Sequence, residues 1–530
     1  MKQQNLLYAI IFFLFFVIVL LPVFTMFAGS IWVEGRISFE NYANLLLDQR
    51  QIALMQNSLW LCLGTTFCCL VLGVPLAFLA SRTNLWGRKI LGLIYVLPVL
   101  IPPYIHAIVW THLLSKNGFL NHSLMALLAL EEPPFNIHGL GGAIFVMTLA
   151  YFPFVTLMTA SGLRSLDRGV EEASLLRHGA WRTIKGITLP LIAPHILCGA
   201  LFVFVFSALN VGVPDILRVH VYPLEIFIQF SAYHNAKAAV ALALPLVVAT
   251  LFMVLLQKRY MKDRPYLSLA AGFDQARPYD LDGLKTGAFT FCVVWVFLSV
   301  VTPVVTLLVI AGPLSTYMKV LETSKEQIWY SVSVAAAAAS LMLLFAFFVS
   351  YFIERAPGRG KGLAEFATLI PFAIPATALG IGMIKVWNRP LTEFIYGSSL
   401  IIILGYVAHF IPFATRVTIS SLKQVNPRLE EAAALVTSNG FGLLGKVILP
   451  LVKPGLLVGF FVGFVLSLGD LGTTLLITPP GKSTVPVKIY NLMHYGAEHM
   501  LAALSLLMIG LITMFSGGFY LAYRKLGRGF

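Results

Sequence analysis

Residues 171–190, EEASLLRHGAWRTIKGITLP, form a polar island in an otherwise apolar chain, and residues 430–450, EEAAALVTSNGFGLLGKVILP, form a second one. Each island opens with Glu-Glu-Ala, which favours a helix, passes through a glycine and ends in Leu-Pro, where an apolar run begins. Proline is common in the first turn of a helix. Each island therefore predicts a helix, a turn, a short helix and the start of a new apolar helix.

The composition places most of the chain in lipid. Of the 530 residues, 58% are hydrophobic and 11% charged, whereas a soluble domain has about 25% charged residues. A membrane-spanning helix needs about 20 apolar residues. Twelve runs approach or exceed that length: 6–29, 56–80, 90–114, 139–162, 191–209, 238–257, 287–312, 329–353, 363–386, 398–421, 451–477 and 501–523. We expect an all-α polytopic membrane protein with about twelve transmembrane helices, the first run being retained as a helix rather than cleaved.

The two halves of the chain repeat each other. Proline landmarks recur between 259 and 281 positions apart, with the jumps in separation falling in loops, and the acidic residues of the islands recur 259 positions apart. These separations predict a first six-helix half at residues 1–257, a cytoplasmic linker at 258–284 and a second six-helix half at 285–530. An even number of spans in each half makes the repeats parallel, with a translocation path near the axis between them.

The placement of basic residues predicts the orientation. With the N-terminus inside, 25 of the 37 Lys and Arg residues fall in cytoplasmic segments, as the positive-inside rule requires. Both termini and both polar islands are then cytoplasmic. The same bias accounts for the net charge of +14 without a nucleic-acid partner. The five cysteines and the scattered histidines have no metal-ligand spacing, so we expect packing roles and no metal site or cofactor.

The polar islands resemble the Glu-Ala-Ala loops of ABC importer permeases, and two copies in one chain resemble the fused permeases of the ferric-iron and thiamine type. The resemblance implies cytoplasmic loops that dock on an ATPase, and the matching residues are Glu172, Ala173, Gly179, Pro190, Glu431, Ala432, Gly440 and Pro450. The first copy departs from the pattern because it reads Glu-Ala-Ser and its glycine comes one place late. The second has Thr437 where a glycine is usual, with Gly440 further on.

This resemblance implies a permease in the bacterial inner membrane that is not itself an enzyme. Its partners would be a cytoplasmic ABC ATPase dimer and an extracytoplasmic substrate-binding protein, and its substrate would be ferric iron, with thiamine, phosphonate and other small solutes left open. The sequence Gly481-Lys482-Ser483-Thr484 is not a phosphate-binding loop, because Leu476 stands where that loop needs its first glycine. The alternative is an ATP-independent secondary transporter with two six-helix halves.

Two further sets of residues are candidates for function. Asn210 and Asp470 are repeat partners near the ends of apolar runs, and they line the translocation path or form hydrogen bonds between helices. Pro98 and Pro102, like Pro371 and Pro375, interrupt the third span of their half. These prolines make either hinges for alternating access or fixed kinks.

Overall fold

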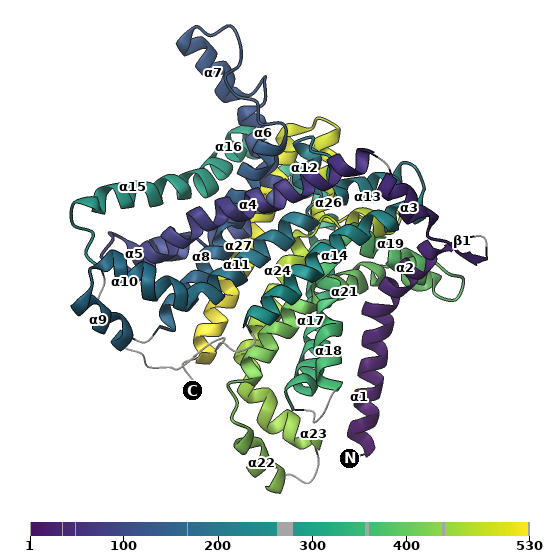
Figure 1. Ribbon diagram of the computed structural model, residues 1–530. Coiled ribbons are helices and arrows are strands. Elements are labelled where there is room, and N and C mark those ends of the chain that lie inside the picture. The colour runs from purple at the N-terminus through teal and green to yellow at the C-terminus, as the bar shows by residue number, and fades with distance from the viewer. Residues whose placement is uncertain are drawn as a thin grey trace. The chain divides into compact units, whose positions relative to one another are not determined.

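The computed structural model describes residues 2–33, 35–47, 49–166, 168–261, 279–355, 360–436 and 440–527 (Figure 1). The predicted linker at 258–284 lies partly outside these residues. The described residues contain ten helices that are long and apolar enough to cross a membrane, and two bent helix pairs of the same character. If each bent pair is one span, the total is twelve. The fold is therefore that of an all-α polytopic membrane protein, as predicted.

The chain forms two compact units. Unit 1 comprises residues 1–47, 225–247 and 310–530, and unit 2 comprises residues 48–224 and 248–309. The elements of unit 1 are α1 (Lys2–Phe15), η1 (Phe16–Leu20), α2 (Leu21–Ile31), β1 (Trp32–Val33), β2 (Arg36–Ile37), α3 (Glu40–Leu47), α17 (Leu314–Arg355), α18 (Gly360–Leu369), η6 (Pro371–Ala373), α19 (Ala376–Trp387), α20 (Glu393–Tyr396), α21 (Leu400–Leu422), α22 (Pro427–Val436), α23 (Gly440–Leu443), η7 (Leu444–Ile448), α24 (Leu449–Gly469), α25 (Thr474–Ile477), α26 (Val485–His494) and α27 (Glu498–Gly527).

The elements of unit 2 are α4 (Gln49–Arg82), α5 (Arg88–Ile94), η2 (Leu97–Leu100), α6 (Pro103–Leu114), α7 (Phe119–Leu128), α8 (Leu140–Arg164), α9 (Arg168–Arg177), α10 (Ala180–Thr183), η3 (Ile184–Thr188), α11 (Leu189–Leu209), α12 (Gly212–Ile216), η4 (Asp282–Leu284), α15 (Lys285–Val296) and η5 (Phe297–Val301). Three helices have residues in both units: α13 (Tyr222–Ser231), α14 (Ala236–Met261) and α16 (Thr302–Ala311).

Each unit is built on three helices packed against one another, α4, α8 and α11 in unit 2 and α17, α21 and α24 in unit 1. Small residues allow close contact in unit 2. A Cβ atom added to Gly73 or to Gly199 would lie 2.8 Å from an atom of Val155, which is closer than normal van der Waals contact. In the sequence repeat, α4, α8 and α11 correspond to α17, α21 and α24. The two halves therefore share the packing of their central helices as well as their proline landmarks.

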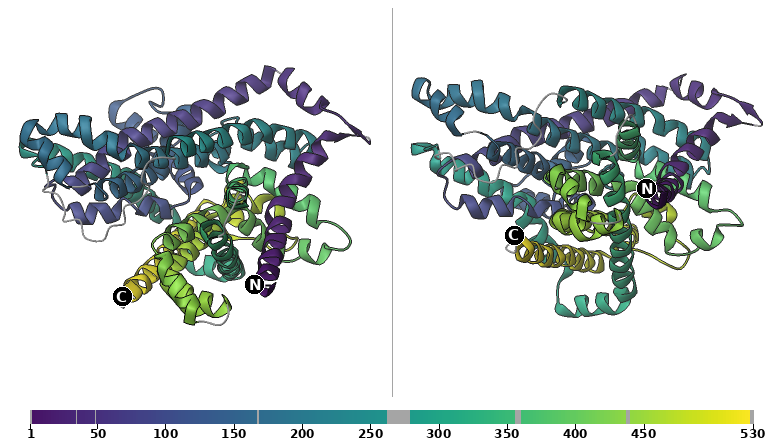
Figure 2. Two further views of the ribbon diagram at one scale, coloured as in Figure 1. Left: turned by 60° about the horizontal axis from the view of Figure 1, so that its bottom comes forward. Right: turned by 90° about the horizontal axis from the view of Figure 1, so that it is seen from below.

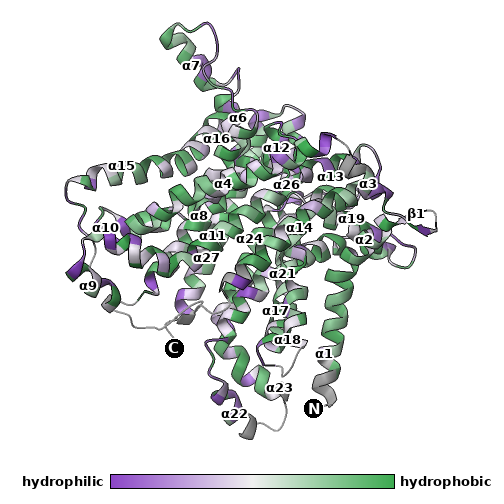
Figure 3. Ribbon diagram, viewed as in Figure 1, coloured by the Kyte–Doolittle hydropathy of each residue, from purple (hydrophilic) through white to green (hydrophobic). Residues whose placement is uncertain are grey.

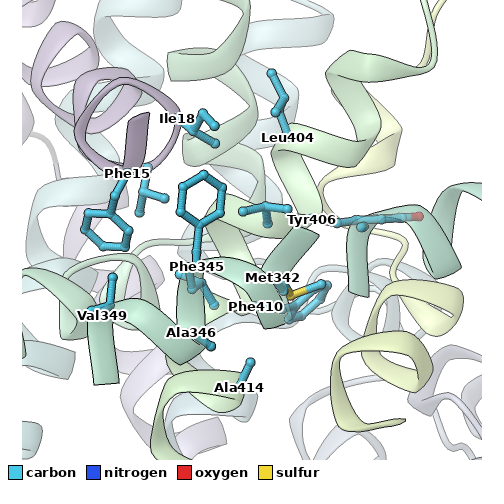
Figure 4. Packing of buried hydrophobic residues seen from close by; sticks show 14 of the residues in the cluster. Phe15, Ile18, Met342, Phe345, Ala346, Val349, Leu404, Tyr406, Phe410 and Ala414 are labelled. Atoms are coloured by element: carbon cyan, nitrogen blue, oxygen red, sulfur yellow. The ribbon is translucent and has the colours of Figure 1, made fainter. Parts of the chain in front are cut away.

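The first helix of each half packs with the central helices of the other half. In unit 1, α1 lies beside α17 (Figures 1 and 2), and the side chains of Phe15 and Ile18 are buried with Phe345 and Val349 (Figure 4). In unit 2, η5 contacts α8 and η2. Burial of such side chains is worth about 1.5–3 kcal/mol each in a water-exposed reference. In lipid, tight packing rather than water exclusion favours the contact.

Four π-helical turns lie in the described residues, and each ends two positions before a proline. They are η1, η3, η5 and η7, and the prolines are Pro22, Pro190, Pro303 and Pro450. Proline lacks a backbone donor and its ring clashes with the carbonyl four residues earlier. A wider π turn avoids that clash while the helix continues. The four π turns form two pairs that correspond in the sequence repeat. Each half therefore has a π turn before the same two prolines.

The third span of each half is broken at its prolines. The two parts bend by 90° between 88–100 and 103–128, and by 108° between 360–373 and 376–387. Pro98 and Pro371 lie in the short helices η2 and η6, and Pro102 and Pro375 cap the helices that follow, with φ −53° and ψ near 139° in both. All four prolines are buried. The predicted interruption is therefore a sharp break, and its role as a hinge stays a prediction.

Candidate functional site

The first polar island folds onto the end of α4. Glu171 lies in the first turn of α9 and is only 1% exposed. Its Oε2 is 3.2 Å from Nη2 of Arg82, the last residue of α4, and its Oε1 accepts a hydrogen bond of 2.8 Å from Thr188 Oγ1. A buried carboxylate is costly unless it is paired and hydrogen-bonded, and here both oxygens have partners.

Arg82 also binds a third element. Its Nη2 donates a hydrogen bond of 2.6 Å to the backbone carbonyl of Leu163, at the end of α8. An apolar cluster of Ala77, Leu163 and Ile192 lies at these helix ends. One guanidinium therefore joins α4, α8 and α9, in a geometry that the fixed fork of arginine donors suits.

The second island repeats this arrangement. Glu430, in the first turn of α22, is buried, and its Oε1 accepts from Nε and Nη2 of Arg355, at 2.8 and 2.6 Å. Arg355 is the last residue of α17, and its Nη2 also donates to the carbonyls of Leu422 and Val425. The hydroxyl of Tyr351 lies 3.4 Å from Glu430 Oε2. Arg82, Leu163 and Glu171 are the repeat partners of Arg355, Leu422 and Glu430.

Most of the residues predicted as coupling residues lie on the exposed side of the islands. Ala173, Gly179 and Pro190 are exposed and Glu172 is half-buried; Glu431, Ala432 and Pro450 are also exposed, and Gly440 begins α23. Sequence analysis missed the first glutamate of each pair and its arginine. The repeat was a usable signal, because the two arginines are 273 positions apart and the two glutamates are 259 apart. These two separations differ only because the loop after α6 is longer than its counterpart in the second half.

As predicted, α11 begins at Leu189 and α24 at Leu449, each with a proline in its first turn. Each is nevertheless continuous with the helical turns before it. Residues 180–209 form one continuous helical segment, and so do residues 444–469. Both run through their prolines because η3 and η7 absorb the missing donor and the ring. The short helix that was expected before each proline is therefore the first turns of the long one. Movement at the island can pass directly along α11 or α24.

The first island exposes large apolar side chains as well as charges. Leu176 is 92% and Trp181 is 74% exposed, and Leu429 on α22 is 53% exposed. The basic residues near Leu176 and Trp181 are also exposed, namely Arg177, Arg182 and Lys185. Figure 3 shows hydrophilic residues on both α9 and α22, at the ends of hydrophobic helices. Exposed apolar groups with a polar rim mark interaction sites on proteins.

Asn210 and Asp470 have the same local role in their two units. Asn210 ends α11, and its Oδ1 accepts a hydrogen bond of 2.9 Å from the amide of Val213. Asp470 ends α24, and its Oδ2 accepts from the amides of Thr473 and Thr474, at 3.1 and 3.3 Å. Each side chain therefore caps the short helix that follows. Asn210 also donates to the hydroxyl of Tyr151, 3.0 Å away. A role in the path stays a prediction.

Within the described residues, no group of three or more His, Cys, Asp and Glu side chains is placed to hold a metal ion. The first glutamate of each island, Glu171 or Glu430, is instead paired with an arginine. The site is therefore a pair of surfaces on polar helices, each anchored from behind by a buried ion pair. Its geometry suits contact with another protein.

Two like sets of membrane helices, each carrying the same polar junction, define a transport protein made of two fused halves. The family of binding-protein-dependent transport system inner membrane components matches residues 69–263 and again residues 344–527, and the chain belongs to it. The protein is thus a multi-pass inner-membrane permease, the non-catalytic component of an ABC transporter.

Among curated relatives, the ferric transport system permease protein FbpB of Actinobacillus pleuropneumoniae is 24% identical over 92% of this chain and 74% of its own. The Fe(3+)-transport system permease protein FbpB 2 of Haemophilus influenzae is 23% identical over 90% of this chain and 91% of its own. A solved bacterial alginate ABC transporter, in complex with an alginate pentasaccharide-bound periplasmic protein, is 19% identical over 50% of this chain and 97% of that chain, with a TM-score of 0.41.

Proposed function

We propose that this permease imports ferric iron by alternating access, driven by two cytoplasmic ABC ATPase subunits that dock on the two polar islands. One fused chain would pair with two ATPase subunits, since it carries two islands. Glu172 and Glu431, with the alanines, glycines and prolines predicted around them, belong to the docking helices. Both termini would be cytoplasmic, because the basic residues concentrate on the side of the islands.

The observation that carries the proposal is the exposed apolar pair on the first island. Leu176 and Trp181 are 92% and 74% exposed, on helices that also carry exposed charged residues. Tryptophan and arginine are enriched among residues that dominate protein interfaces, and Arg177 and Arg182 are exposed next to this pair. The same helical segment stands at the same place in the second half. A partner with two equivalent grooves fits this arrangement.

Ferric iron as the substrate is supported by the relatives, which are ferric transport permeases by name and align with nearly the whole chain. An extracytoplasmic binding protein would deliver it, in keeping with the family description. The permease would then hold the ion only during passage. Selection would lie mainly in the delivering protein.

The test uses the full chain in proteoliposomes with its ATPase and an iron-loaded binding protein on opposite sides of the bilayer. The expected result is uptake of ⁵⁵Fe³⁺ that requires ATP on the side of the islands and the loaded binding protein on the other side. Uptake that continues without ATP and follows an ion gradient would instead establish a secondary transporter. Thiamine or 2-aminoethylphosphonate, offered with their own binding proteins, would test the substrate.

A further inference from the structure

The two buried ion pairs are the same three-way junction made twice. We call the junction of Arg82, Leu163 and Glu171 the first clasp, and the junction of Arg355, Leu422 and Glu430 the second clasp. In each, the guanidinium at the end of one spanning helix contacts a carboxylate on the polar helix and a carbonyl at the end of another spanning helix.

We infer that Arg82 and Arg355 are positioning residues that fix each docking helix to two spanning helices, so that displacement of the docking helix moves the gate. This inference rests on the proposed docking function. On α9, the clasp residue Glu171 and the exposed Leu176 lie about 140° apart around the helix, so they occupy different faces. A partner that pulls on the exposed face therefore pulls against the clasp.

The position of each clasp favours transmission along the chain's longest helices. Arg82 ends α4, which has 34 residues, and Arg355 ends α17, which has 42. At about 1.5 Å per residue these helices extend roughly 50 and 60 Å. When such a helix moves as a rigid body, displacement of the end that carries the clasp also displaces its far end. Both charges of the first pair are buried, and in the second pair Glu430 is buried while the side chain of Arg355 is 17% exposed. Loss of one partner therefore leaves a largely buried charge uncompensated.

The first clasp has a further layer. The backbone amide of Tyr279, at the end of the linker, donates to the carbonyl of Arg82, and the amide of Asn84 donates to the carbonyl of Tyr279. The ring of Tyr279 lies against Phe78, with centroids 5.4 Å apart. Burial raises the pKa of the Tyr279 phenol, and the Glu171 carboxylate adds to this rise. Tyr279 is thus fastened to the helix end that carries the clasp.

The experiment compares neutral variants of the clasp with a matched exposed pair. Glu171→Gln and Glu430→Gln keep the size of the side chain and remove its charge. Arg355→Lys keeps the positive charge but loses the planar guanidinium that contacts several acceptors at once. The control is Lys423→Ala, because Lys423 pairs with Glu354 across the ends of the same two helices while its side chain is 60% exposed. Exposed pairs contribute little. The readouts are ATPase copurification, iron uptake per ATP hydrolysed, and hydrogen exchange of the α9 and α22 amides.

The expected result is that the clasp variants still bind the ATPase, while uptake per ATP falls about tenfold, as typical coupling free energies allow, and exchange rises in α9 or α22. Lys423→Ala should match the wild type. Unchanged uptake per ATP in both glutamine variants would overturn the role of the clasps, even if the ATPase binds. If the wild-type chain binds no ATPase, the docking function itself fails, which is a separate outcome.

Discussion

Replacing Leu176 and Trp181 together with alanine should weaken docking of the ATPase subunit on the first island without unfolding the permease. Both side chains are already largely exposed in the free chain, so their removal should change the free energy of unfolding by no more than about 0.5 kcal/mol. In the complex they would be buried. Loss of a buried leucine costs about 1.5–3 kcal/mol and loss of a tryptophan hot spot at least about 2 kcal/mol.

Together these changes predict a loss of about 4 kcal/mol in binding, which corresponds to a Kd raised roughly a thousandfold. The assay is titration of nanodisc-embedded permease with the labelled ATPase, beside a thermal melt of the permease alone. The control is Leu391→Ala, since Leu391 is 90% exposed but is predicted to lie on the outer side. A double variant that binds the ATPase within about threefold of the wild type would refute the docking face.

Two further predictions concern packing and capping. Gly199→Ala should destabilise the permease by about 1–3 kcal/mol, because the added methyl would lie 2.8 Å from Val155. Gly459→Ala should be nearly neutral, because the nearest atom to its added methyl is 3.7 Å away. The measurement is the melting temperature of both variants in one detergent, and equal losses of stability would contradict the packing. Asp470→Ala should cost about 1 kcal/mol through the lost cap, while Asp470→Asn should keep the melting temperature. A change in KM for iron in Asp470→Asn, at unchanged stability, would assign this side chain to the path as well.

The helices of this fold were predictable because a run of about 20 apolar residues has few alternatives in a membrane. The repeat was predictable because its proline landmarks recur in the same order, with separations that change only in loops. The packing of α1 in unit 1 was not predictable, because an apolar helix can pack against many apolar neighbours. No feature of residues 6–29 indicates which helix they contact. The bends after Pro98 and Pro371 were foreseen as interruptions, but their size depends on tertiary contacts.

The candidate site was predictable in outline and not in its chemistry. Glu-Glu-Ala identified the polar helices, but the sequence does not say which glutamate of a pair faces inward. On α9, one step along the chain turns the side chain by about 100°, and this rotation separates buried Glu171 from half-buried Glu172. The ion pair with Arg82 joins residues far apart in sequence, so only the fold brings them together. Likewise, the continuity of α10, η3 and α11 before Pro190 was not predicted, because a π turn leaves no mark in the sequence.

The central claim is that the polar islands face a nucleotide-hydrolysing partner in the cytoplasm. Gly179 is suited to test it, because it is exposed, has a φ of −64° and has no atom within 4 Å of an added Cβ. In Gly179→Cys, the new thiol should react with a membrane-impermeant maleimide in inside-out vesicles and form a cross-link to the ATPase there, while staying unlabelled in intact spheroplasts. Labelling from the periplasmic side, or a cross-link to no ATPase in the assembled complex, would contradict the account.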